Sequence, residues 1–547
     1  VNDDYFIMPE SDVTIRAKWS KADLSKSMNG TSAVLPLFYS IIEDQAVMDN
    51  TASSYVSSSN GIDFSKISSY TNGNGVYTRA GTENDEYPVH YYRGNVTNNN
   101  VKFAGFCWKA VRTTSTGGVK LIYNGTLDDN GTCVKSEYDR ITIGEVYYNT
   151  SASSPADVGY MYGTRHTVSN KNISWYDIVG KEAEYLTSMR STNYYYADSV
   201  TYSNGTYTLN NPTQYLWSAN YSNLVGKYTC SSETDTKCTS VSYVISSNSS
   251  RMNYVAMNNG ETYDSLYTQA NNLNWVYGND VTWNGSRYTL VDTIESKPAE
   301  MANDKSTLAE KYHYTCLSSN NSCTTVYYIH TYGESTISYF TLEQGKKIDT
   351  LRQEMMTNTN DSVIKETIDT WYENNLLDYA EYLEDTVWCN DRSIVSGSLA
   401  GKDTTATDNT IFGPYERKTT THNPIVTCPN KNDAFTVGSE LGNGDLTYPI
   451  ATLTIDEVNM AGEAGANSNY YLFTSNNWAS FWWTISPIHI HNSGASSNGY
   501  YLYYDAGAEY VSVNSTRNVR PAISLNHDIV VVNGTGTNSN PYEVDFP

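Results

Sequence analysis

Basic side chains are scarce in this chain. Its 547 residues include 35 Lys and Arg against 59 Asp and Glu, which gives a formal net charge of -24 at pH 7. A surface with this charge repels phosphate backbones and anionic lipid headgroups. The sequence also lacks any apolar run of the roughly eighteen residues that a membrane span requires. We therefore expect no nucleic-acid partner and no insertion of this fragment into a membrane.

Familiar catalytic motifs are missing as well. No G-x-S-x-G motif and no glycine-rich phosphate loop stands out. Ser362-Val-Ile-Lys365 matches the S-x-x-K pattern of a Ser/Lys nucleophile. Its usual S-D-N and K-T-G partners are absent, and Ser362 is better explained as a helix N-cap. We expect a protein that is not an enzyme.

Metal-binding patterns are equally weak. None of the eight cysteines has C-x-x-C spacing, so a zinc ribbon is not expected. The stretch from Asp128 to Gly131 looks like part of a calcium loop but lacks the distal glutamate of an EF-hand, and a turn is favoured. His489 and His491 form an H-x-H pair without a third ligand at a diagnostic spacing. We expect no cofactor, and a structural calcium ion has no other support in the sequence.

Tyrosine and paired cysteines are what the chain has in quantity. It contains 49 Tyr, and its mean hydropathy of -0.52 indicates a very polar surface. Tyr offers a large, rigid contact area at low entropic cost, although strand positions at the solvent edge of a β-rich fold would explain many of them. In an exported chain, cysteines that fall as neighbouring pairs predict four disulfides. The pairs are Cys107 with Cys133, Cys230 with Cys238, Cys316 with Cys323, and Cys389 with Cys428.

An internal duplication lies within residues 198–348. The segment 198–209 matches 279–290, and the Tyr-Thr-Cys element at 228–230 matches the one at 314–316. Each copy is expected to form a hairpin with an Asn-Gly turn, a helical middle and a second hairpin closed by its own disulfide. Closing such a short loop stabilises a small module by roughly 2.5 kcal/mol in the chain-entropy model.

The remainder of the chain predicts strands and a few helices. Strands are expected at 87–92, 101–112 and 119–123, and helices at 348–356 and 362–383. Residues 454–457 form a capping box, with Gly462 at the C-cap side of that helix. Between 476 and 525 we expect three short strands, one of them marked by the alternation of Val511 and Val513.

The same C-terminal stretch carries a family resemblance. Its W-W-T-I-S-P motif at 482–487 and V-R-P-A-I-S-L motif at 519–525 resemble the end of an uncharacterised domain of Gram-positive surface proteins. That domain is similar to the C-type-lectin-like fold of formylglycine-generating enzymes. Further stretches carry the resemblance: 103–108, 158–163, 371–376, 389–392 and 428–433. Because no cysteine occurs from Trp478 onward, the resemblance does not extend to the oxidase activity of those enzymes.

The resemblance implies a domain plan. An α+β, C-type-lectin-like head with antiparallel sheets is expected at 21–165 and 346–547. The duplicated, disulfide-pinned modules interrupt it as repeat 1 (166–270) and repeat 2 (271–345). Residues 8–19 resemble the last strand of an internalin-type B-repeat, so 1–20 are expected to be the end of such a β-grasp-like module. We therefore expect a fragment of a longer protein exported to a bacterial cell surface.

In C-type-lectin-like proteins, loops and strand ends near this region form the ligand face. The resemblance therefore implies a set of ligand-binding residues: Asn476, Asn477, His489, His491, Asn492, Tyr501, Tyr503, Asp505, Glu509 and Tyr510. Trp482, Trp483 and Arg520 are expected to be interior, with Arg520 bridging strand ends through its guanidinium fork.

Three hypotheses of function follow. The first is a secreted, non-catalytic adhesin whose Tyr/Asn-rich face binds an extracellular protein or glycan. In the second, the inserted repeats are the binding or spacer part and the head is a scaffold. The third is an enzyme whose site the motifs do not reveal.

Overall fold

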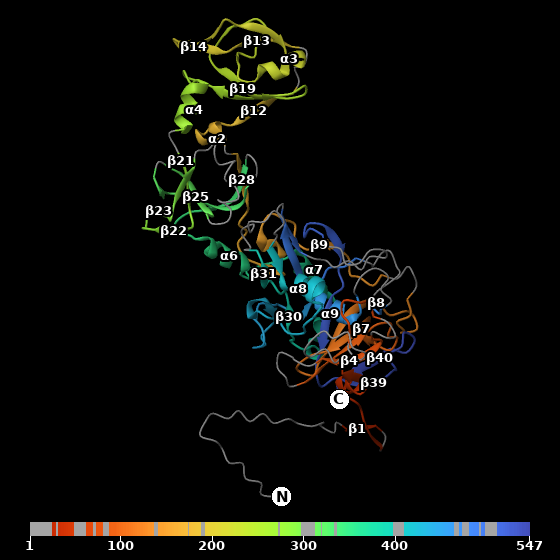
Figure 1. Ribbon diagram of the computed structural model, residues 1–547. Helices are drawn as coiled ribbons and strands as arrows, with labels where there is room; N and C mark the ends of the chain where they lie inside the picture. The colour runs from red at the N-terminus through yellow and green to blue at the C-terminus, as the bar shows by residue number, and fades with distance from the viewer. Residues whose placement is uncertain are drawn as a thin grey trace, which may run out of the picture.

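The chain folds into three bodies that follow one another in a row (Figure 1). The fold is a mixed α+β structure of many strands and few helices, as the sequence predicts at that level. The computed structural model describes residues 25–28, 31–48, 62–68, 73–79, 87–135, 140–172, 174–187, 192–271, 274–296, 312–318, 320–332, 336–397, 410–463, 470–472, 481–491, 494–497 and 511–546. The end of the B-repeat expected at 1–20 lies outside these residues.

A branched ten-stranded sheet forms the centre of the largest body, which we call the head. Its order is β3-β4-β5-β7-β6-β40-β39, and β8, β38 and β34 continue from β7. Most pairs are antiparallel, whereas β3–β4 and β40–β6 are parallel. The strands are β3 (Ala46–Met48), β4 (Gly75–Arg79), β5 (Val89–Arg93), β6 (Asn100–Phe103), β7 (Phe106–Thr113), β8 (Val119–Thr126), β34 (Ile450–Ala451), β38 (Ala522–Leu525), β39 (Val530–Asn533) and β40 (Tyr542–Asp545).

Helices cover this sheet and smaller strands surround it. α7 packs its Trp371 against Trp108 and Tyr123 of the sheet, with ring centroids 6.2 and 5.4 Å away. The helical elements of the head are α1 (Phe38–Glu43), η1 (Pro155–Val158), α7 (Val363–Asn375), η2 (Leu377–Tyr382), α8 (Gly413–Glu416), η3 (Arg417–Thr421), η4 (Lys431–Asp433) and α9 (Ile455–Ala461). The other strands are β1 (Ser25–Met28), β2 (Thr31–Val34), β9 (Glu145–Tyr147), β10 (Met161–Tyr162), β29 (Asn360–Asp361), β30 (Trp388–Cys389), β31 (Ile394–Ser396), β32 (Thr410–Phe412), β33 (Ala434–Phe435), β35 (Pro487–His491), β36 (Gly494–Ser497) and β37 (Thr516–Asn518).

Local predictions for the head are mostly confirmed. Ser362 caps α7 by accepting the N–H of Lys365, and Thr454 and Glu457 form the capping box of α9. The strand expected at 101–112 is in fact β6 and β7, because Ala104 and Gly105 turn the chain with φ of 52° and 80°. The strand expected around Val511 and Val513 is also wrong, since Val511 lies in an irregular segment and Val513 in the turn that precedes β37.

The two remaining bodies have the same architecture. The module next to the head, which we call proximal, has the sheet β11-β28-β27-β25-β21-β24 and a small sheet β22-β23-β26. Its elements are β11 (Ser169–Asn172), β21 (Asn274–Gly278), β22 (Asp280–Trp283), β23 (Tyr288–Val291), β24 (Ile294–Ser296), β25 (Tyr314–Ser318), β26 (Ser322–Cys323), β27 (Val326–Tyr332), β28 (Thr336–Leu342) and α6 (Ile348–Met356). The module beyond it, which we call distal, has the matching sheets β12-β20-β19-β17-β13-β16 and β14-β15-β18.

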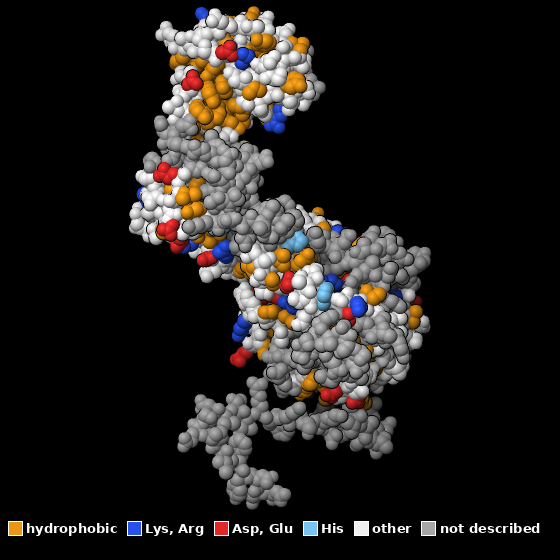
Figure 2. All heavy atoms as spheres, viewed as in Figure 1, with side chains coloured by type: hydrophobic (Ala, Val, Ile, Leu, Met, Phe, Trp, Pro, Cys, Tyr) orange, Lys and Arg blue, Asp and Glu red, His pale blue; other side chains and the backbone are white. Residues whose placement is uncertain are grey.

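The distal module also contains helices. Its elements are α2 (Trp175–Ile178), β12 (Ala183–Leu186), β13 (Asn193–Ala197), β14 (Ser199–Ser203), β15 (Thr206–Asn210), β16 (Thr213–Leu216), α3 (Trp217–Leu224), β17 (Tyr228–Thr229), β18 (Lys237–Cys238), β19 (Val241–Ser247), β20 (Met252–Met257) and α4 (Tyr263–Asn271). Rings of α2 and α4 meet here: Trp175 lies 5.2 Å from Tyr263, which stacks on Tyr243 at 4.6 Å. Figure 2 shows hydrophobic side chains gathered on this part of the distal module.

The modules are nested rather than consecutive. β11 precedes the whole distal module in sequence, yet it pairs with β28 in the proximal sheet. Residues 169–172, which the sequence analysis assigned to repeat 1, therefore complete the sheet of repeat 2. The proximal module in turn leaves the head between β10 and β29, which pair with each other, so the two ends of the whole insertion lie side by side. Each insertion thus interrupts a body without breaking its sheet.

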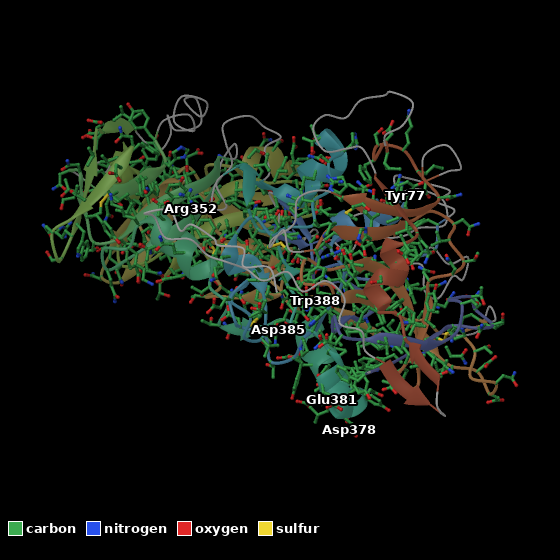
Figure 3. The ribbon with its side chains drawn as sticks, turned by 90° about the horizontal axis from the view of Figure 1, so that it is seen from below. Tyr77, Arg352, Asp378, Glu381, Asp385 and Trp388 are labelled. Atoms are coloured by element: carbon green, nitrogen blue, oxygen red, sulfur yellow. A yellow bond between two sulfur atoms is a disulfide. The ribbon has the colours of Figure 1, made fainter. Side chains whose placement is uncertain are left out.

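Disulfides and shared cores hold these bodies together. The structure contains the bonds Cys107–Cys133, Cys230–Cys238, Cys316–Cys323 and Cys389–Cys428, so the expected disulfide bonds are confirmed. The proximal module shares one hydrophobic cluster with the head, in which Leu351 of α6 joins Val158 and Phe412. In Figure 3, Arg352 of the same helix lies on the side of the head that faces the modules, and Tyr77 lies on the opposite side.

Candidate functional site

Most of the predicted ligand-binding residues lie outside the described part of the chain. This holds for Asn476, Asn477, Asn492, Tyr501, Tyr503, Asp505, Glu509 and Tyr510. His491 lies on β35, and its side chain is not described. His489 was expected at the surface, but its side chain is buried. Its ring centroid lies 5.9 Å from that of Tyr415.

The conspicuous C-terminal motif belongs to the interior. Trp482 and Trp483 are buried, as expected. The Arg520 guanidinium lies 5.4 Å from the Trp482 ring and donates to the carbonyl oxygens of Tyr123 (3.1 Å) and Leu472 (3.2 Å). Burial lowers the pKa of Arg520 to about 10, so it stays charged at neutral pH. The motif therefore joins separate chain segments through one side chain.

Replacing Arg520 tests this role. Arg520→Lys keeps the positive charge but cannot reach both carbonyl oxygens with a planar fork. We expect a loss of about 1–3 kcal/mol in the free energy of unfolding, because a buried carbonyl is left without a donor. Denaturant titration measures the change, and Arg251→Lys, on an exposed turn of the distal module, is the matched control. Equal stability of the parent and Arg520→Lys would contradict the bridging role.

A group of buried charges lies where α9 begins. The Glu457 carboxylate forms ion pairs with Arg112 at 2.7 Å and with Lys120 at 2.9 Å. All three side chains are buried. Lys120 also sits 4.1 Å above the ring of Trp388. Burial alone would raise the pKa of Glu457, but Lys120 and Arg112 outweigh it and lower the pKa to about 2. Glu457 is therefore held as a carboxylate between two cations.

A second buried ion pair adjoins the first. Arg417 binds Asp456 through two nitrogen–oxygen contacts of 2.8 Å each and reaches Asp391 at 2.8 Å. Both groups border a cavity of about 20 Å³, which has room for about one water molecule. Each charge faces an opposite charge, and the cavity does not admit a substrate. We interpret this cluster as the anchor that fixes α9 and the Cys389–Cys428 loop against the sheet.

The acidic residues at the lower edge of the head include one carboxylate with a structural role. Asp378, Glu381 and Asp385 lie there in Figure 3, below Trp388. The Asp385 carboxylate accepts the backbone N–H groups of Val437, Gly438 and Ser439, each at 2.7 Å. Its charge is used to hold a loop. Within the described ranges, no group of three or more His, Cys, Asp or Glu side chains has the geometry of a metal site.

An open groove of about 520 Å³ lies on the proximal module. Trp283, at the end of β22, lines it together with hydroxyl, amide and carboxylate groups: Ser286, Thr324, Thr325, Glu343 and Gln344. Trp283 is half-buried, whereas Glu343 and Gln344 are exposed. Pairing of β23 with β26 and the Cys316–Cys323 bond place Thr324 beside the hairpin. The groove therefore combines one aromatic ring with several hydrogen-bonding groups.

The distal module repeats this arrangement. Tyr202 takes the place of Trp283, and each ring packs on a tyrosine at 4.7 Å, Tyr207 in one module and Tyr288 in the other. Each ring also lies over the glycine of a turn, Gly260 or Gly345, at which the chain is left-handed. In the distal module, Thr239, Ser240, Asn258 and Asn259 align in sequence with Thr324, Thr325, Glu343 and Gln344 of the proximal groove, respectively. The distal surface lacks the carboxylate of Glu343.

The sequence alone did not indicate this surface. The duplication aligned Trp283 with Tyr202, but we assigned no role to the aromatic position. The sequence did contain a signal for it. Both copies have an aromatic residue at the end of a strand and, further along the chain, a polar residue followed by glycine. Only the fold brings those segments, about 60 residues apart in sequence, into contact.

Among the described residues, no helix is both long and apolar enough to cross a membrane. No family model matches the chain, and no match was found among the curated proteins or the solved structures.

Proposed function

We propose that this chain is a non-catalytic, extracellular binding protein of a bacterial cell surface, and that its inserted modules take part in binding. The observation that carries the proposal is the open groove at Trp283 together with its counterpart at Tyr202. Both lie on bodies that project from the head in series (Figure 1).

Further features support the setting. The four disulfides fit a secreted or extracellular protein. The C-terminal motif resembles surface proteins of Gram-positive bacteria, and on the same basis we propose a C-type-lectin-like fold for the head. The buried charges around Glu457 are paired with one another, which favours a structural scaffold over a catalytic site.

A binding array tests the proposal. The purified, oxidised chain is applied to arrays of glycans and of host and bacterial surface proteins, with and without calcium. We expect selective, saturable binding to at least one class of ligand, lost when the protein is unfolded by reduction in denaturant. Absence of binding to every glycan and protein, or turnover of a bound substrate, would refute the proposal.

A further inference from the structure

We infer that the groove at Trp283 binds a neutral polysaccharide, and that Tyr202 provides a second, weaker contact for the same polymer. This inference rests on the proposed binding function and names its ligand. It begins from the composition of the groove, in which one aromatic ring adjoins three hydroxyls, an amide and a carboxylate. A pyranose offers an apolar face to a ring and hydroxyls to polar groups at its edge, so the groove and the sugar are complementary.

The position of the Trp283 ring is fixed before any ligand arrives. A Cβ atom on Gly345 would lie 2.7 Å from Cδ1 of Trp283, so only glycine permits this approach. Gln344 and Gly345 have φ of 54° and 82°, a turn that the hydroxyl of Tyr288 ties down by donating to the Lys346 carbonyl at 2.9 Å. A preorganised aromatic platform loses little entropy on binding.

The size and openness of the groove favour part of a chain over a free monosaccharide. It is a shallow surface that is largely open to solvent, not an enclosed pocket. Ser286 and Thr324 come from different hairpins, so a bound sugar would be held from two sides. An open groove on a projecting hairpin also lets a polymer continue in both directions.

Charge selects among polysaccharides. The chain carries a net charge of -24, and the groove contains the carboxylate of Glu343 without a Lys or Arg among its lining residues. Sulfated, sialylated and phosphate-containing polymers are repelled by such a surface. A neutral glycan keeps the hydrogen bonds without this repulsion.

The duplication makes two contacts with one polymer feasible. The hairpins of β22 and β14 project from the same side of the row of bodies in Figure 1. Two weak sites on one rod bind a long polymer more tightly than a short oligosaccharide, because the second contact forms within the complex. The distal surface has Tyr and Asn where the proximal groove has Trp and Glu, which explains its weaker contact.

Calorimetric titration of the full chain tests the inference with short neutral oligosaccharides of glucose, mannose and galactose and with their polymers. We expect Trp283→Ala to weaken oligosaccharide binding at least about tenfold, as truncation of an aromatic anchor does. Trp283→Phe should retain most of the binding. Tyr202→Ala should leave the oligosaccharide affinity unchanged and weaken only the polymer, and Glu343→Gln should weaken both without affecting the fold.

Tyr185→Ala is the control, since Tyr185 is 59 % exposed on the distal module but lies on β12, away from either hairpin. The inference is wrong if Trp283→Ala, with an unchanged melting temperature, binds neutral glycans as well as the parent does. It is also wrong if anionic glycans bind better, or if only proteins bind, although a protein ligand would leave the proposed function intact. Absence of every ligand would reject both.

Discussion

Replacing Glu457 by Gln should lower the free energy of unfolding by about 3–5 kcal/mol at neutral pH. The substitution keeps the size of the side chain but removes the negative charge between Arg112 and Lys120. Both cations then remain buried without neutralisation, and desolvated charge is costly inside a protein. Chemical denaturation followed by circular dichroism at pH 7 measures the difference between parent and variant.

The pH dependence of stability provides a second test of the charges around Glu457. The pKa of Glu457 is about 2 in the folded protein, whereas an unfolded chain has a Glu pKa of about 4.3. A depressed folded pKa contributes stability that is present above pH 4.3 and is lost as the pH falls toward 2. The contribution amounts to about 3 kcal/mol. The stability difference between parent and Glu457→Gln should therefore shrink over this acidic range.

An exposed ion pair provides the matched control. Glu543 lies 3.1 Å from Lys102, and the two side chains are 43 % and 31 % exposed, respectively. Glu543→Gln makes the same chemical change where water screens the charges, so the expected loss is below about 1 kcal/mol. Similar losses at both positions would mean that Glu457 is not the electrostatic centre of the cluster.

Local features of the fold were predictable because a few neighbouring residues determine them. The helix at 348–356 and the N-cap at Ser362 follow from residues within one or two turns. Cysteines that are neighbours in sequence were paired without knowledge of the fold. The interior position of Trp482 followed from its size and its apolar strand.

Features that depend on distant segments were not predictable. The ion-pair partner of Arg112, Glu457, lies 345 residues away in the chain, and no local pattern connects the two. His489 was expected at the surface because the family resemblance placed it in the ligand face, yet it is buried beside the ring of Tyr415. The membership of β11 in the proximal sheet had no signal either, because a four-residue polar segment carries no periodicity that assigns it to a partner.

The nested topology makes the strongest structural prediction. In the distal module, residues 187–192 connect β12 to β13 across four strand spacings of its sheet. The proximal module makes the corresponding connection, from β11 to β21, with the entire distal module. Replacing residues 173–273 by the segment 187–192 should therefore leave the head and the proximal module folded.

Scanning calorimetry distinguishes this excision from one based on the repeat boundaries in the sequence. Loss of about 100 residues should lower the unfolding enthalpy by about 70 kcal/mol near 60 °C, while the melting temperature of the remainder stays the same. Deleting 166–270 instead removes β11 as well and leaves β28 as an unpaired edge, so that variant should unfold at a lower temperature and aggregate more readily. If both deletions behave alike, β11 is not part of the proximal sheet in solution. If only the replacement of residues 173–273 keeps the remainder stable, the distal module is an independent folding unit that is inserted within the proximal module.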